Sequence, residues 1–232
     1  MNFRWDRLAD GVFRTRLPFL DVTVGLVVGR DGGMLIDTGS TLSEARAVSA
    51  DVAELAEHQV RHVLLTHNHF DHVLGSGVFV GAQVYCAPPV ADTMTSGKEH
   101  LRADALRHGA DGDEVNAALG ALREPDRQVW EAVVDLGGPT VSLSHPGRGH
   151  TGHDLIAAVT DPTRRVVFCG DLVEESGDPC VDEDSDLDAW PATLDRLLAI
   201  GGENAVYVPG HGAVVDADFL RRQREWLADR SR

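Results

Sequence analysis

Four residues of metal-ligand type stand within six positions, directly after an apolar run. Residues 64–77 read LLTHNHFDHVLGSG, and the four are His67, His69, Asp71 and His72. Imidazole nitrogens and carboxylate oxygens are preferred ligands of zinc and iron. Because alternate residues at a strand end can point the same way, one loop can present several of them to a metal. A His-x-His pair alone is also typical of a solvated surface loop, so further ligands have to come from elsewhere.

Three further ligand-type residues follow apolar runs in the second half of the chain. His150 lies in HPGRGHTGHD, Asp171 ends VVFCGD, and His211 follows VYVPG. Gly170 and Gly210 directly precede two of them and allow the backbone to turn sharply there. The repeated order of apolar strand, glycine and ligand is what functional loops on a rigid scaffold require. These spacings predict a metal site assembled from several strand ends.

The complete set resembles the metallo-β-lactamase superfamily. The pattern His67-x-His69-x-Asp71-His72 is followed in the family's order by GHTGHD, FCGD and PGHG, and is preceded by LIDTG. The resemblance runs nearly end to end. It implies an α/β fold, the αββα four-layer sandwich, with metals in a shallow cleft at one edge of two sheets.

The same resemblance implies a role for each ligand. It assigns His67, His69 and His150 to a first metal, Asp71, His72 and His211 to a second, and Asp171 to both. Two zinc ions per chain are expected, with iron or manganese as alternatives. Asp37 in LIDTG would buttress the His67 loop, or would be an ordinary turn aspartate.

Such a site predicts a dinuclear zinc hydrolase. Zinc lowers the pKa of bound water to about 7, so a metal-bridging hydroxide would be available at neutral pH. The expected substrate is a small molecule, an ester, thioester, lactone or related amide. Asp71 is the catalytic candidate, orienting the water or moving its proton. The chain contains no Gly-x-Ser-x-Gly elbow that would indicate covalent acyl transfer.

Other reactions stay open within the resemblance. A mononuclear iron persulfide dioxygenase keeps similar motifs, and a β-lactamase is a further alternative, although such enzymes are usually exported. Members that process RNA typically add a domain and a basic surface. A metal-binding member without catalysis is disfavoured because all seven ligand positions are filled.

Composition sets the remaining limits. The chain has 232 residues, 43% hydrophobic and 25% charged, which predicts one domain over residues 1–232. The net charge of −16 argues against a nucleic-acid partner. The absence of a long apolar segment and of a signal peptide, with only three cysteines, predicts a cytoplasmic protein without membrane contact. The oligomeric state stays open.

Apolar runs and turn residues predict the secondary structure. Strands are expected at 11–19, 22–29, 32–39, 62–67, 82–88, 139–147, 154–161, 165–171 and 204–212, and helices at 40–58, 188–201 and 216–230. Ser40 or Thr41 is the expected cap of the first helix. Residues 89–127 indicate an inserted pair of short helices. Their apolar residues would form a lid over the cleft, pack on the sandwich or make a dimer contact: Met94, Leu101, Leu106, Val115, Leu119 and Leu122.

The remaining candidates receive smaller roles. His145 and His153 flank His150, and either could orient a ligand through a hydrogen bond. Cys169 is expected to face the core or cleft floor as a small hydrophobe, and Cys180 is close enough in sequence to Asp171 to note. The acidic run at 177–188 lacks calcium-loop spacing and indicates a solvated loop. The histidines with no partner pattern are predicted to be surface or structural residues: His58, His62, His100 and His108.

Overall fold

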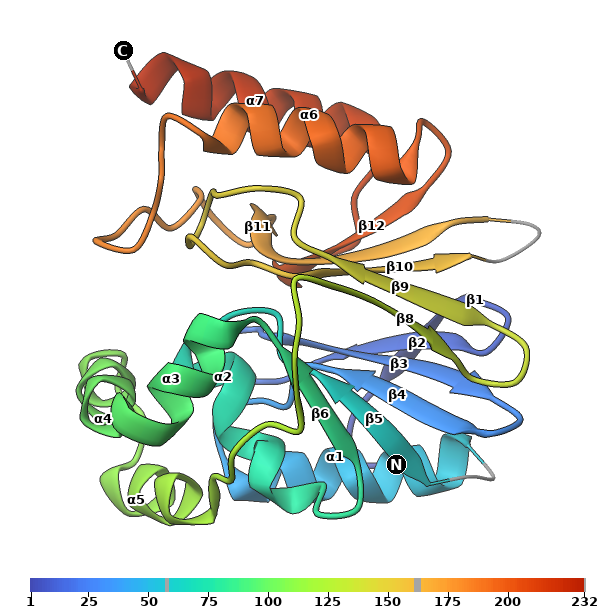
Figure 1. Cartoon of the computed structure of the whole chain (residues 1–232), viewed down its shortest axis with the longest axis vertical. Helices are drawn as coiled ribbons and strands as arrows, with labels where there is room; N and C mark the ends of the chain where they lie inside the picture. The colour runs from blue at the N-terminus through green and yellow to red at the C-terminus, as the bar shows by residue number, and fades with distance from the viewer. Residues whose placement is uncertain (57–58, 161–163, 232) are drawn as a thin grey trace.

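Two β-sheets face each other, and helices cover the outer face of each (Figure 1). The computed structural model describes residues 1–56, 59–160 and 164–231. Helix α1 (Leu42–Leu55) lies outside one sheet, while α6 (Trp190–Gly201) and α7 (Ala217–Arg230) cover the other. The expected αββα sandwich is confirmed.

The first sheet has the order β1-β2-β3-β4-β5-β6-β7. Its strands are β1 (Trp5–Ala9), β2 (Val12–Arg16), β3 (Thr23–Gly29), β4 (Gly32–Ile36), β5 (Val60–Leu64), β6 (Gln83–Cys86) and β7 (Arg127–Gln128). The first four run antiparallel, and β4 through β7 run parallel. Ile36 pairs with Leu64, so β4 and β5 end at the same edge. The loop that contains Asp37 of the LIDTG motif and the loop that contains the THNHFDH motif therefore lie next to each other.

The second sheet has the order β12-β11-β10-β9-β8. Its strands are β8 (Glu131–Asp135), β9 (Thr140–Ser144), β10 (Ile156–Thr160), β11 (Val166–Glu174) and β12 (Val206–His211). β11 and β12 are parallel, with a register irregularity around Gly170. Gly170 has a φ of 53°, a conformation that favours glycine. This irregularity falls directly before Asp171.

Helix α1 forms where the sequence places its cap and its apolar stripe. The Thr41 hydroxyl accepts a hydrogen bond from the backbone N–H of Glu44 at 3.1 Å. Leu42, Ala45 and Val48 are buried at helical spacing against the sheet. The predicted helix at 40–58 is thus confirmed in its central part. Residues 57–58, including His58, and residue 161 of a predicted strand lie outside the described residues.

Apolar side chains fill two separate layers. One cluster occupies the space between the sheets and beneath α1. The other lies under α6 and α7, where Trp190 and Tyr207 are fully buried. Cys169 belongs to this second cluster, as expected for a small hydrophobe.

The inserted segment contains three helices instead of the predicted pair. They are α3 (Pro88–Ser96), α4 (Lys98–Arg107) and α5 (Gly112–Ala121). Gly97 separates the first two, and Gly109, with a φ of 85°, follows the second. Five of the six apolar residues expected to line a lid are buried in the core: Met94, Leu101, Val115, Leu119 and Leu122. The prediction of an apolar cleft wall is wrong, and the alternative of helices packed on the sandwich holds.

Two short helical turns, α2 (Phe70–Val73) and η1 (Leu74–Val78), follow the histidine loop. Within the described ranges, no helix has the length and apolar character needed to cross a lipid bilayer.

Candidate metal centre

The seven predicted ligands meet at one edge of the sandwich, where β5, β11 and β12 end. Their donor atoms form two sets, each with all atoms within 4.8 Å of one another: His67, His69, His150 and Asp171 in one, and Asp71, His72 and His211 in the other. The resemblance assigns the three histidines of the first set to one metal and the three residues of the second set to the other, and this assignment stays a prediction.

The local backbone explains how one loop supplies four of these residues. β5 ends at Leu64, and His67 follows in a buried loop. His69 is the extended residue that precedes α2, with φ −75° and ψ 148°. Asp71 and His72 then lie in the single turn of α2. There they form the second set together with His211.

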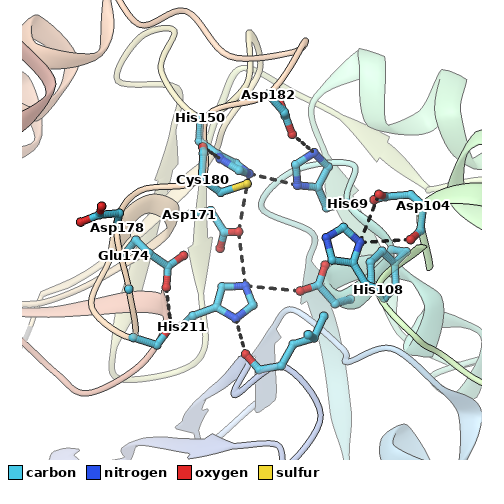
Figure 2. A pocket seen from close by; sticks show the side chains of 15 residues that line it. His69, Asp104, His108, His150, Asp171, Glu174, Asp178, Cys180, Asp182 and His211 are labelled. Carbon is cyan, nitrogen blue, oxygen red and sulfur yellow. Dashed lines mark hydrogen bonds and ion pairs between the residues drawn. The ribbon is translucent and has the colours of Figure 1, made fainter. Parts of the chain in front are cut away.

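The carboxylate of Asp171 lies between the two sets. Its Oδ2 is 3.6 Å from Nε2 of His67 and 3.5 Å from Nε2 of His150. The same oxygen is 3.3 Å from Nε2 of His211, and Oδ1 is 3.3 Å from Nε2 of His72. Figure 2 shows Asp171 between His150 and His211. One carboxylate with both oxygens directed at opposing imidazoles can bridge two cations.

Two ligand histidines are oriented by backbone carbonyls. Nδ1 of His150 donates to the carbonyl of Cys180 at 3.2 Å, and Nδ1 of His211 donates to the carbonyl of Leu20 at 2.7 Å. A carbonyl only accepts, so in each ring Nδ1 carries a proton and Nε2 faces the centre. This is how ligand imidazoles are usually fixed.

Asp37 orients a third ligand and supports the loop. Its Oδ1 accepts from the backbone N–H of Thr66 at 2.8 Å, and its Oδ2 lies 2.9 Å from Nδ1 of His72. The Thr66 hydroxyl donates to Asp37 at 2.9 Å, so its oxygen is available to Nδ1 of His67 at 3.0 Å. These contacts support the buttressing role over that of an ordinary turn aspartate.

The negative charges of Asp71 and Asp171 favour positive charge on the groups around them. Burial opposes protonation of His72, yet Asp171 and Asp71 together raise its pKa well above the usual range. The pKa of His211 is raised for the same reason, with burial again opposed mainly by Asp171. Burial raises the pKa of Asp71, but His72 and His211 lower it further, to about 2. Bound cations would supply this positive charge without protons.

His67 and His150 are suited to bind a cation as neutral imidazoles. Burial lowers the pKa of His67 well below its usual range and that of His150 to about 4. Nε2 of His67, Nε2 of His72 and Oδ1 of Asp171 are buried without a hydrogen bond to another described residue. Buried polar atoms of this kind require a partner. The donor types and these unbonded atoms fit metal ions of the zinc class.

A cavity of about 230 Å³ opens beside this centre. Asp104 and His108 of the α4 segment line it, and sequence reasoning missed both (Figure 2). Nδ1 of His108 lies 3.3 Å from the Asp104 carboxylate, and its ring stacks on Phe70 at 5.6 Å. His108 is exposed, as predicted for a surface residue, and it also lines the cavity. Its spacing of four residues from Asp104, which places both on one helix face, was the available signal.

The acidic run after β11 is also part of the site. Cys180 and Asp182 line the cavity, and Oδ2 of Asp182 is 3.7 Å from Nε2 of His69. The hydroxyl of Ser185 donates to the carbonyl of His150 at 2.8 Å. The run is largely exposed, as expected for a solvated loop, and it also forms one wall of the cleft beside His69 and His150.

Glu174, at the end of β11, is a further carboxylate that the sequence did not single out. It is buried beside the ligands, and its donor atom lies within 4.8 Å of those of Asp171 and His211. Its Oε1 accepts from the Ser176 hydroxyl at 2.7 Å. Burial, followed by the charge of Asp171, raises the pKa of Glu174 to about 7.

The two histidines that flank His150 lie outside both donor sets and outside the cavity lining. Nδ1 of His145 contacts the carbonyl of Asp154 at 2.8 Å, and its ring packs on Trp130 at 5.0 Å. His153 is buried, which lowers its pKa to about 4. None of their described hydrogen bonds reaches a ligand side chain. His62 packs on Tyr85, and His100 is exposed, as expected.

The metallo-β-lactamase superfamily model matches residues 17–211. The chain belongs to this superfamily.

Curated relatives are distant and longer. The chain is 22% identical to a linear primary-alkylsulfatase from Pseudomonas sp. (strain ATCC 19151), over 88% of this chain and 44% of that protein. It is 26% identical to a type 2 metallo-β-lactamase from Bacteroides fragilis, over 40% of this chain and 37% of that protein. The matches thus span less than half of either relative.

Among solved structures, the metallo-β-lactamase FIM-1 from Pseudomonas aeruginosa in its mono-zinc form is similar to this chain. The TM-score is 0.75 at 16% identity, covering 99% of this chain and 96% of that one. At this identity the likeness shows the fold.

Proposed function

We propose that the protein is a dinuclear zinc hydrolase of small esters, thioesters, lactones or related amides. The observation that carries this proposal is the arrangement of two donor sets around the single carboxylate of Asp171. A centre for one ion would need only one of these sets.

Each set would hold one zinc ion. His67, His69 and His150 would bind the first, Asp71, His72 and His211 the second, and Asp171 both. Zinc, when bound, would lower the pKa of a bound water to near neutral pH. As a Lewis acid it would also polarise the bond that is attacked. The imidazoles are held with one nitrogen inward by their outward hydrogen bonds, so the protein needs little rearrangement to bind the ions.

Asp71 is the proposed catalytic carboxylate. It is buried, and its Oδ2 lies 3.3 Å from Nε2 of His211 and 3.6 Å from Nε2 of His72. Because its pKa is held at about 2, it stays ionised through the neutral range and accepts hydrogen bonds. We assign to it the orientation of the attacking water, as an acceptor of its hydrogen bond.

The substrate class rests on the site and on the relatives. A cavity of about 230 Å³ beside the ligands suits a small molecule. One relative is named for alkyl sulfates, which are esters, and the other for β-lactams, which are cyclic amides. Both names are compatible with cleavage of an acyl-type or ester bond. A cytoplasmic location stays a prediction, which the three free cysteines favour.

Hydrolysis by the zinc-loaded protein tests this proposal. A panel of p-nitrophenyl esters, thioesters, lactones and a chromogenic β-lactam is assayed with the protein and with Asp171→Ala, His211→Ala and His100→Gln. The first two variants should lose activity and zinc, whereas exposed His100 should tolerate its change. Full activity in Asp171→Ala, or oxygen uptake with a persulfide by an iron-loaded protein that hydrolyses nothing, would contradict it.

A further inference from the structure

The cleft lining contains acidic residues beyond the two ligand sets. These are Asp104, Glu174, Asp178 and Asp182. No lysine or arginine of the described chain lines the cleft. The nitrogen-bearing side chains that do are His69, His108, His150 and His211.

The acidic residues stand on two sides of the opening. Glu174, Asp178 and Asp182 belong to β11 and the segment after it, and Asp104 faces them from α4 (Figure 2). Groups on opposite walls act together on whatever enters between them, because a cleft with low-dielectric walls concentrates the field.

Two of these carboxylates carry the charge argument. Asp178 is exposed, and no ion pair is described for it. Asp182 is 40% exposed, and its described ion-pair partner is the ligand His69 at 3.7 Å. The charge of Asp104 is partly offset by Arg107, whose Nη2 lies 2.7 Å away on the exposed side of α4.

We propose, building on the hydrolase function above, that the cleft selects substrates by charge. The part of the substrate beside the scissile bond is neutral or cationic, and an ammonium group there raises kcat/KM. A free carboxylate in that position would meet Asp178 and Asp182 with no arginine or lysine to pair with. The metal ligands act on the reacting group itself, so this selection concerns the remainder of the molecule.

Three esters that differ only in one terminal group provide the test. p-Nitrophenyl esters of a short acyl chain ending in methyl, carboxylate or trimethylammonium share the same reacting bond. At low salt, kcat/KM for the trimethylammonium ester should exceed that for the carboxylate ester by about tenfold. Salt shortens the range of exposed charges, from about 30 Å at 0.01 M to about 3 Å at 1 M, so this ratio should decrease in about 0.5 M salt.

Variants of one exposed residue assign the effect to the cleft. Asp178→Asn should lower the trimethylammonium-to-carboxylate ratio, and Asp178→Lys should lower it further. The methyl ester should be cleaved at nearly the same rate by both. Asp188→Asn removes the same charge from an exposed residue of the same loop outside the lining and should leave the ratio unchanged.

A binding measurement separates the two proposals. Calorimetry with uncleavable ether analogues carrying the same terminal groups should show tighter binding of the trimethylammonium form. Equal binding, or preference for the carboxylate, would overturn charge selection even in an active hydrolase. Preferential binding of the cation without cleavage of any ester would support charge selection and count against the hydrolase proposal.

Discussion

Oδ2 of Asp37 lies 2.9 Å from Nδ1 of His72, although 35 positions separate the two residues. The parallel pairing of β4 with β5 brings them together, because both strands end at the same edge of the sheet. Asp37 thereby determines which nitrogen of His72 faces the second donor set.

Replacing Asp37 should weaken the second metal site. In Asp37→Asn an amide NH₂ can face Nδ1 of His72, and the charge that stabilises this imidazole is lost. We expect the dissociation constant of the second zinc to rise about 10- to 100-fold. Competition with a chromogenic chelator measures this dissociation constant. Asp31→Asn, at an exposed position, is the control and should leave the constant unchanged. An unchanged constant in Asp37→Asn would refute the orienting role.

Gly210 allows Asp171 to occupy its central position. A Cβ at Gly210 would overlap Oδ1 of Asp171, whereas a Cβ at Gly152 in the His150 loop meets no atom within 4 Å. Gly210→Ala should therefore displace the carboxylate and reduce zinc content, and Gly152→Ala should bind zinc normally. Elemental analysis of folded samples, checked by circular dichroism, compares them. Full zinc content in Gly210→Ala would contradict this role of Gly210.

The ligand residues could be located from sequence because each follows an apolar run and a turn. His150 lies in the loop between β9 and β10, Asp171 inside β11 and His211 at the end of β12, and the strand order that unites them was available only through the family resemblance. The contact between Asp37 and His72 depends on strand pairing, which one sequence does not specify. The spacing of residues along the sequence thus predicts which side chains are candidate ligands. The pairing of the strands determines which of these side chains contact one another.

The cleft walls could not be predicted in the same way. Asp104 lies in α4 and His108 directly follows it, and the position of this helix depends on packing of its buried face, for example through Leu101. β8 went unrecognised although Ala132 and Val134 alternate with more exposed neighbours, because short edge strands give a weak signal. Gly97 separates α3 from α4 and Gly109 follows α4, which divides the segment into three helices where the sequence predicted two.

Zinc binding should release protons. His72 and His211 have raised pKa values in the metal-free protein, so both are protonated at pH 7 and must lose a proton to bind zinc. The apparent zinc affinity should therefore rise with pH. Calorimetry in buffers of different ionisation enthalpy counts the protons released.

A variant of His211 tests whether this residue supplies one of the released protons. His211→Ala should release about one proton fewer than the unmodified chain, while the exposed His100→Gln should match it. Proton release that is absent, or equal in all three proteins, would contradict the charge distribution at the centre.

Asp51 anchors the N-terminal segment to α1. Its buried carboxylate accepts from the backbone N–H groups of Asn2 and Phe3 and from Nε1 of Trp5. Burial raises its pKa, but these donors lower it more, leaving a net decrease from 3.8. The resulting stability is present above pH 3.8 and is lost as the pH falls through the folded-state pKa.

Asp51→Asn should lower the free energy of unfolding by about 1–3 kcal/mol at pH 7. The difference from the unmodified chain should shrink below pH 4, taken as about the usual aspartate pKa. Glu54→Gln, on the same helix with a 59% exposed side chain, should change stability by less than about 1 kcal/mol. Urea unfolding of metal-free protein measures all three, and a difference independent of pH would contradict the role of the charge.

The most direct measurement is the metal content of the purified protein, expressed without added metal and then with zinc or iron supplied. Two donor sets that share Asp171 predict about two zinc ions per chain, with less than this in Asp171→Ala. A content of about one iron per chain, with no second ion taken up from excess zinc, would contradict the dinuclear hydrolase.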